Sequence, residues 1–129
     1  MQAALRQPGL ATIDEVADAY AISRHHLGKV VHGLAQKGYL KTRRGIGGGF
    51  TLGMPPARIG VGAVVRLTEE DANVIECVNR ATGPCAILPA CRLRSVLAEA
   101  AAAFYGALDR YTLEDLVQRR SEMRELLGI

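Results

Sequence analysis

Apolar residues recur with a helical period in two short stretches near the start of the chain. Spacings of three and four residues place the first set on one helical face: Ile13, Val16, Ala17 and Tyr20. The same spacing relates the members of a second set: Leu27, Val30, Val31 and Leu34. Two short helices joined by a tight turn are typical of a helix-turn-helix, so the pattern predicts one here.

Local signals place the ends of both helices. Thr12 and Glu15 have the spacing of a capping box, in which each side chain binds the other residue's backbone N–H at a helix start. Ser23 is a good N-cap for the second helix, after a turn at residues 21–22. Gly38 suits the left-handed residue that ends a helix, and Lys37 complements the helix dipole there.

A glycine-rich segment follows the second helix. Residues 39–43 and 50–52 favour β-strands, and the tip between them, residues 44–49, contains four glycines. This pattern predicts a β-hairpin, and a basic hairpin directly after a helix-turn-helix is a wing. The glycines do not form a nucleotide-binding loop, because no Gly-Lys-Ser/Thr follows them and Phe50 replaces the last glycine of G-x-G-x-x-G.

The rest of the chain contains one long helical pattern. After the break at Pro55–Pro56, residues 61–67 favour a short helix, and residues 72–91 favour irregular structure. Residues 92–110 then form the longest helix, whose apolar stripe needs a second helix against it; a dimer partner supplies one. The predicted dimer contacts are Leu93, Val96, Leu97, Ala100, Phe104 and Leu108. Thr112 caps a further short helix, and the last residues are predicted to be a tail.

The predicted fold is therefore mainly α with a small β-hairpin: a winged helix-turn-helix plus a long dimerisation helix. We divide the chain into residues 1–54 as the winged helix-turn-helix, residues 55–91 as the connecting helix and cysteine-containing loop, and residues 92–129 as the dimerisation helix and C-terminal tail. Apolar residues make up 49% of the chain, which is typical of a globular protein. No secretory signal or membrane-length apolar run is present, so we expect a cytoplasmic protein without membrane contact.

Charge is distributed unevenly along the chain. Residues 1–66 contain nine Lys and Arg against three Asp and Glu, whereas residues 67–129 contain seven against ten. A basic half suggests a polyanionic partner, and double-stranded DNA fits the motif. Donor-bearing or small residues on the second helix and the wing are the predicted DNA-binding set: Ser23, Arg24, His25, Gly28, Lys29, His32, Arg43 and Arg44. The three histidines lack the i, i+4 spacing of a helical metal site.

Three cysteines, Cys77, Cys85 and Cys91, lie within fifteen residues. An odd number cannot all pair within one chain, and thiols stay reduced in a cytoplasmic protein. Their spacing does not fit zinc, because there is no C-x2-C pair and no fourth Cys or His nearby. An iron–sulfur cluster accepts wider spacings. From the residues alone, a cluster, reactive thiols and inert buried cysteines all remain open.

From residue 3 to the C-terminus the chain resembles the nitric-oxide-sensing iron–sulfur repressors of the Rrf-type winged-helix family. The segments that carry the resemblance are Ile22–Leu27 with Lys29–Val30, Arg43–Gly49, Glu76–Cys77, Cys85–Leu93 and Leu108–Leu116. The resemblance implies a homodimer on a palindromic operator, with one cluster (2Fe-2S or 4Fe-4S) per subunit. It also implies that Cys77, Cys85 and Cys91 ligate the cluster, and that nitric oxide is the signal that releases the DNA.

The chain departs from these relatives at its start. They open with a full helix whose acidic residue can supply a fourth cluster ligand to the other subunit. This sequence begins inside that helix and has no Asp or Glu before Asp14. We expect that the start codon is assigned too far downstream; a truncated paralogue or a different fourth ligand are the alternatives.

The sequence leaves other functions open beside this one. A related regulator that senses iron or cluster supply, or thiol oxidation, would share the same layout. A dimerisation module that no longer binds DNA is a second class. An enzyme is the least favoured class, because the sequence contains no nucleophile–base pair, paired carboxylates or cofactor fingerprint.

Overall fold

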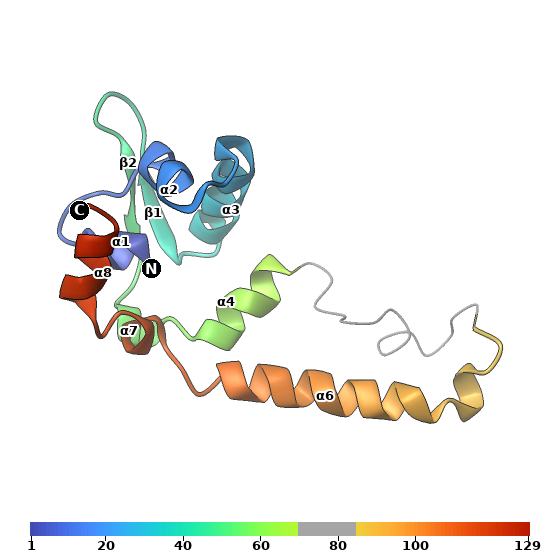
Figure 1. The fold of residues 1–129 in the computed structure, drawn as a ribbon. Coiled ribbons are helices and arrows are strands. Elements are labelled where there is room, and N and C mark those ends of the chain that lie inside the picture. Colours follow the sequence, from blue (N-terminus) through green and yellow to red (C-terminus); the bar gives the residue numbers. More distant parts are fainter. Residues whose placement is uncertain (70–84) are drawn as a thin grey trace. The chain divides into compact units, whose positions relative to one another are not determined.

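The computed structural model describes residues 1–69 and 85–129. The chain divides into two compact units, one formed by Met1–Ile59 together with Thr112–Ile129 and the other by Gly60–Tyr111. Figure 1 shows the elements of each unit. The helices and the hairpin predicted from the sequence are present, so the predicted mainly α class with a small β-hairpin is confirmed.

The helix-turn-helix consists of α2 (Ile13–Tyr20) and α3 (Arg24–Gln36). The predicted capping box is formed: the Glu15 amide donates to Thr12 Oγ1 at 3.2 Å, and the Thr12 amide donates to Glu15 Oε2 at 3.1 Å. Ser23 caps α3 by accepting a hydrogen bond from the His26 amide. Both helix starts therefore lie where their own side chains satisfy the first free backbone donors.

The wing is an antiparallel pair of strands, β1 (Leu40–Arg43) and β2 (Gly49–Leu52), with Leu40 opposite Leu52. The segment before α2 also pairs with β2, because Ala11 and Phe50 exchange two backbone hydrogen bonds of 2.9 and 2.8 Å. This pairing ties the hairpin to the start of the helix-turn-helix. The position of the wing relative to α2 is thus set by backbone hydrogen bonds as well as by packing.

One apolar core holds the first unit together. It gathers buried side chains from the helices, the hairpin and the C-terminal segment: Leu5, Val16, Ala17, Leu27, Val31, Leu40, Phe50, Leu52, Ile59 and Val117. The short helix α1 (Gln2–Leu5) is buried throughout and packs against β2. Burial of this apolar surface is the main force that holds α2 and α3 at a constant angle.

The C-terminal segment differs from the prediction. The short helix predicted after Thr112 is present as α7 (Leu113–Leu116), but the predicted tail forms a further helix, α8 (Arg120–Leu126), which contacts α1. The Leu113 amide donates to the Ile59 carbonyl at 2.8 Å, and Val117 is completely buried. A helix of seven residues, such as α8, is not stable by itself. Tertiary packing stabilises α8, and for that reason the local sequence pattern did not predict it. Residues 112–129 consequently belong to the first unit and not with the long helix.

The second unit is built on α4 (Val61–Thr68) and the long helix α6 (Arg92–Leu108), which contact each other. Arg66 on α4 forms a two-pronged ion pair with Asp109, with both N–O distances 2.7 Å, and its guanidinium lies 4.6 Å from the centre of the Tyr105 ring. A methyl group at Gly62 would collide with the Asp109 carboxylate. The glycine therefore allows the close approach at which this ion pair forms.

The Arg66–Asp109 pair gives a pH-dependent contribution to stability. The hydrogen-bonded guanidinium lowers the pKa of Asp109, so the stabilisation is complete above the ordinary aspartate pKa and is lost as the pH falls through the lowered value. Asp109→Asn is expected to lower the Tm at pH 7, because it removes the ion pair. The decrease should be only a few degrees, since both side chains of the pair are exposed to solvent. The difference should shrink below about pH 4. Thermal unfolding against pH checks this. Glu99→Gln, on the helix that Asp109 caps, should show no such change; equal effects of both variants would contradict the prediction.

Candidate nucleic-acid interface and cysteine segment

One face of α3 presents hydrogen-bond donors to solvent. His25, Lys29 and His32 follow at spacings of four and three residues, and all three side chains are exposed. Within the described ranges none of them takes part in an ion pair. Gly28 lies on the same face but is half-buried, with Ile13 of α2 about 4.0 Å from where its Cβ would be. The side chains of His25, Lys29 and His32 are therefore accessible and free of ion pairs within the described ranges.

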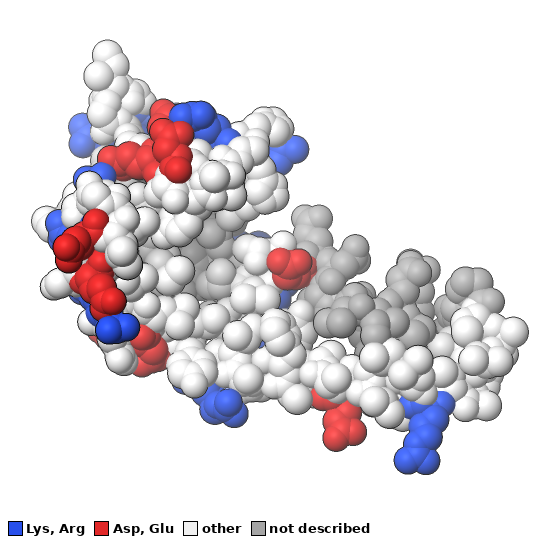
Figure 2. All heavy atoms as spheres, viewed as in Figure 1, with Lys and Arg blue, Asp and Glu red and all other residues white. Residues whose placement is uncertain are grey.

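Arg24 differs from these residues because its guanidinium is already occupied. Nε donates to Asp14 at 2.6 Å and Nη2 donates to Asp18 at 2.7 Å, both on α2. The hydrogen bond that Arg24 donates to Asp14 and the negative charge of Asp18 raise the pKa of Arg24. Figure 2 shows red and blue side chains side by side over these helices. In this structure Arg24 links the two helices of the motif, and its predicted contact with DNA stays a prediction.

A groove of about 550 Å³ runs between α2, α3 and the hairpin. His32 lines it from α3, and Arg43, Arg44 and the glycines of the tip line it from the wing. Both arginines are exposed. Helix and wing donors thus border one hollow surface, as is needed to contact a base edge and the neighbouring backbone together.

The cysteines are only partly within the described residues. Cys85 is exposed and Cys91 is half-buried, and both are free thiols; Cys77 lies outside the described residues. Between them is a single 3-10 turn, η2 (Leu88–Ala90), in which the Leu88 amide donates to the Cys85 carbonyl at 3.1 Å. Leu88 is buried. Cys91 is the N-cap residue of α6 and immediately precedes that helix.

This donor set is compatible with an iron–sulfur cluster, which is bound by thiolates. Two of the three predicted ligands are unpaired and reachable, and a buried leucine holds the short segment between them. No group of three metal-binding side chains occurs among residues 1–69 and 85–129, which lack Cys77. The structure therefore neither assembles nor separates the predicted triad.

The apolar stripe of α6 divides into two sides. Leu93, Val96, Ala100 and Phe104 are exposed, whereas Leu97 and Leu108 are half-buried. Not one residue of this helix is buried. A 17-residue helix with this much exposed apolar surface is unusual in a chain that functions alone.

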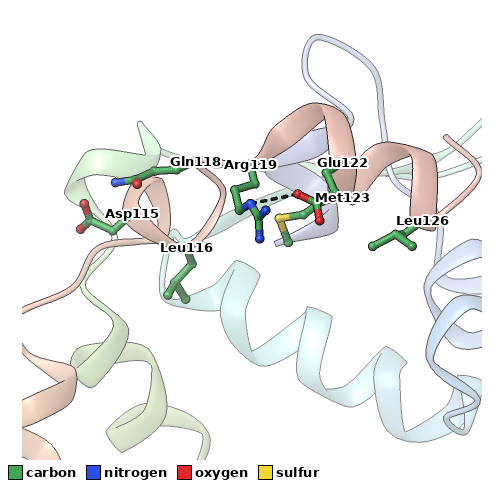
Figure 3. A pocket seen from close by; sticks show the side chains of 7 residues that line it. All are labelled: Asp115, Leu116, Gln118, Arg119, Glu122, Met123 and Leu126. Carbon is green, nitrogen blue, oxygen red and sulfur yellow. Dashed lines mark ion pairs between the residues drawn. The ribbon is translucent and has the colours of Figure 1, made fainter.

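A second hollow lies between α7 and α8. Figure 3 shows Leu116, Met123 and Leu126 pointing to one side of these helices, beside the Arg119–Glu122 ion pair of 2.9 Å. The polar residues around it do not form a nucleophile–base arrangement. We assign no function to it.

Comparison with known proteins identifies the family. Residues 1–119 match the model of the Rrf2 family, described as an iron-dependent transcriptional regulator. The chain belongs to the Rrf2 family. This agrees with the predicted resemblance, and with the prediction that the chain is a regulator and not an enzyme. Within the described part of the chain, no helix has the length and apolar character needed to cross a membrane.

Individual relatives show which regulators the chain is similar to. The chain is 46% identical over 125 residues to the HTH-type transcriptional regulator NsrR of Bacillus subtilis, covering 96% of this chain and 86% of the relative. It is 45% identical over 124 residues to the NsrR of Geobacillus kaustophilus, covering 96% and 84%. The chain is thus similar to NsrR proteins over nearly its whole length.

Two solved structures share the fold of this chain. IscR of T. potens has a TM-score of 0.68 at 22% identity, covering 95% of this chain and 79% of that one. CymR, the global cysteine regulator of B. subtilis, has a TM-score of 0.59 at 29% identity, covering 91% and 84%. These matches support the winged-helix architecture derived from the hydrophobic pattern.

Proposed function

We propose that this Rrf2-family chain is a transcriptional repressor that binds duplex DNA as a homodimer and releases it in response to nitric oxide. In this proposal an iron–sulfur cluster held by Cys77, Cys85 and Cys91 is the sensor. The observation that carries the DNA-binding part is the exposed donor face of α3 beside the basic wing, in a chain similar to HTH-type regulators. The sensing part is supported by the free thiols and by the resemblance to nitric-oxide-sensing repressors.

DNA contact follows from the two surfaces that border the groove. The face of α3 enters the major groove, where donors such as Lys29 and His32 reach base edges and phosphates. Arg43 and Arg44 on the wing contact phosphates or the adjacent minor groove. The full proposed set is Ser23, Arg24, His25, Gly28, Lys29, His32, Arg43 and Arg44.

Dimerisation is assigned to the exposed stripe of α6. Leu93, Val96, Ala100 and Phe104 expose apolar surface that a second copy of the same helix would cover. Leu97 and Leu108, also predicted as dimer contacts, border the stripe and are half-buried. A two-fold dimer presents two copies of α3 to a palindromic operator, at a separation of about one turn of DNA.

Within the second unit, the cysteine residues connect the proposed iron–sulfur cluster, which is the sensor, to α6, the helix proposed to form the dimer. When bound, an iron–sulfur cluster supplies iron atoms that react with nitric oxide. The chain's own part is positional: Cys91 precedes α6 directly, and buried Leu88 links it to Cys85. While the cluster holds the thiolates in place, the start of α6 stays fixed. When the cluster no longer holds them, the start of α6 can move. A hundredfold change in operator affinity needs only about 2.7 kcal/mol of such coupling.

The test uses the wild-type chain purified without oxygen. We expect a brown protein that contains iron and binds a duplex from the region upstream of its own gene in a gel-shift assay. Addition of nitric oxide should bleach the visible absorbance and abolish the shift. A colourless, iron-free protein that still binds this duplex would contradict the cluster; a chain that binds no duplex DNA would contradict the repressor.

One observation favours a second candidate, a regulator that senses thiol oxidation. Cys85 is exposed and unpaired, so an oxidant can reach its sulfur. The same sample distinguishes the two candidates: release of DNA by peroxide from iron-free protein, reversed by a thiol reductant, would support oxidation sensing.

A further inference from the structure

The wing carries an apolar side chain at its tip. Ile46 is fully exposed, with a relative exposure of 106%, more than any other large hydrophobic residue within the described ranges. The next most exposed, Leu126, reaches 81%. An isoleucine held entirely in water contributes nothing to the core, so its whole apolar surface is free to contact a partner.

The backbone around Ile46 forms a narrow turn. Gly45 and Gly47 have φ angles of +95° and +70°, which side-chain-bearing residues rarely adopt. The Gly48 amide donates to the Gly45 carbonyl at 2.9 Å, and a Cβ at Gly48 would collide with the Arg43 carbonyl. Ile46 is the only side chain in residues 45–49, because the other four are glycine. The tip is therefore a bare backbone turn that carries one side chain.

A slender tip with basic flanks fits one feature of duplex DNA. The minor groove is only about 6 Å wide and is walled by phosphates and sugars. Figure 2 shows an uncharged tip that projects beyond the charged side chains. Arg43 ends β1 and Arg44 begins the tip, so these two exposed side chains flank Ile46 and can contact the phosphates on the groove walls.

We propose that Ile46 enters the minor groove beside the site read by α3, making an apolar contact with the sugars and the groove floor. This inference rests on the proposed DNA-binding function and adds a specificity-determining residue to it. Guanine places its N2 amino group on the groove floor, where an apolar side chain would leave it without a hydrogen-bond partner. Ile46 therefore selects A·T pairs at that position, while the arginines contribute affinity without selecting sequence.

The first test compares three variants on one duplex, selected by the wild-type chain from a random-sequence pool. Ile46→Ala is expected to bind about tenfold more weakly, a loss of about 1.4 kcal/mol, because buried methyl and methylene groups are removed. The dependence of affinity on salt should stay unchanged, since no phosphate contact is lost. Arg43→Ala should instead reduce the salt slope by about one. Leu126→Ala, an exposed apolar residue on α8, should bind like wild type.

The second test changes only the groove floor. G·C and inosine·C pairs look alike in the major groove, but inosine lacks the N2 amino group. At the base pair protected by the wing, wild type should prefer inosine·C to G·C about tenfold, and Ile46→Ala should lose most of this preference. If Ile46→Ala binds both duplexes like wild type, or changes the oligomeric state instead of the affinity, the inference is wrong. If wild type binds no duplex DNA, the proposed function fails with it.

Discussion

Cys85→Ala is expected to fold and dimerise but to bind its operator about a hundredfold more weakly than wild type, a loss of about 2.7 kcal/mol. Cys85 is exposed, so its sulfur makes no contribution to the core and the fold should survive. Under the proposed function it is one of only three thiolates in the chain, and two cannot hold a cluster as three do. Iron content, visible absorbance and anisotropy titrations of anaerobic protein measure the effect.

The matched control for Cys85→Ala lies two residues away. Ile87 is 66% exposed in the same segment, so Ile87→Ala removes an exposed side chain without removing a thiol. This control should retain iron, operator affinity and release by nitric oxide. A Cys85→Ala protein that binds the operator tightly and still releases it on nitric oxide would rule out the cluster mechanism.

Ala100→Glu is expected to convert the dimer to a monomer. Ala100 lies at the centre of the exposed apolar stripe of α6, between Val96 and Phe104. A carboxylate placed there would be taken out of water without a partner when two helices pack, which costs several kcal/mol. We expect the dimer Kd to rise at least about a hundredfold and the affinity for a palindromic duplex to fall with it.

Ala102→Glu is a close control, because it makes the same chemical change in the same helix. Two residues correspond to rather more than half a helical turn, so Ala102 is exposed on the opposite side from Ala100. Sedimentation velocity should show a dimer for Ala102→Glu and a monomer for Ala100→Glu. Equal behaviour of the two variants would show that the stripe is not the dimer contact.

Arg24 shows how the same residue acquires a different role in three dimensions. From the sequence it belongs to the basic face of the second helix. In the structure it lies against two carboxylates of α2, ten and six residues earlier in the chain. A spacing pattern along one helix contains no information about acids on another helix. The sequence signal that could have revealed these contacts of Arg24 is the acidic face of α2, formed by Asp14 and Asp18.

Locally determined features could be predicted from the sequence alone. Thr12 with Glu15, and Ser23, marked the helix starts because a cap forms between residues two or three positions apart. Two β-prone runs around a glycine-rich tip likewise predicted the hairpin that forms. The family resemblance also depended on contiguous segments, and the comparisons confirmed it.

Features made by residues distant in the chain were decided only by the tertiary structure. The Arg66–Asp109 pair joins residues 43 positions apart, and α8 forms where a tail was predicted because it packs against α1 at the other end of the chain. The stripe of α6 was predicted as a single set, yet packing beside α4 leaves some members half-buried and others exposed. Burial depends on what the fold brings alongside a residue, and sequence periodicity states only which residues share a face.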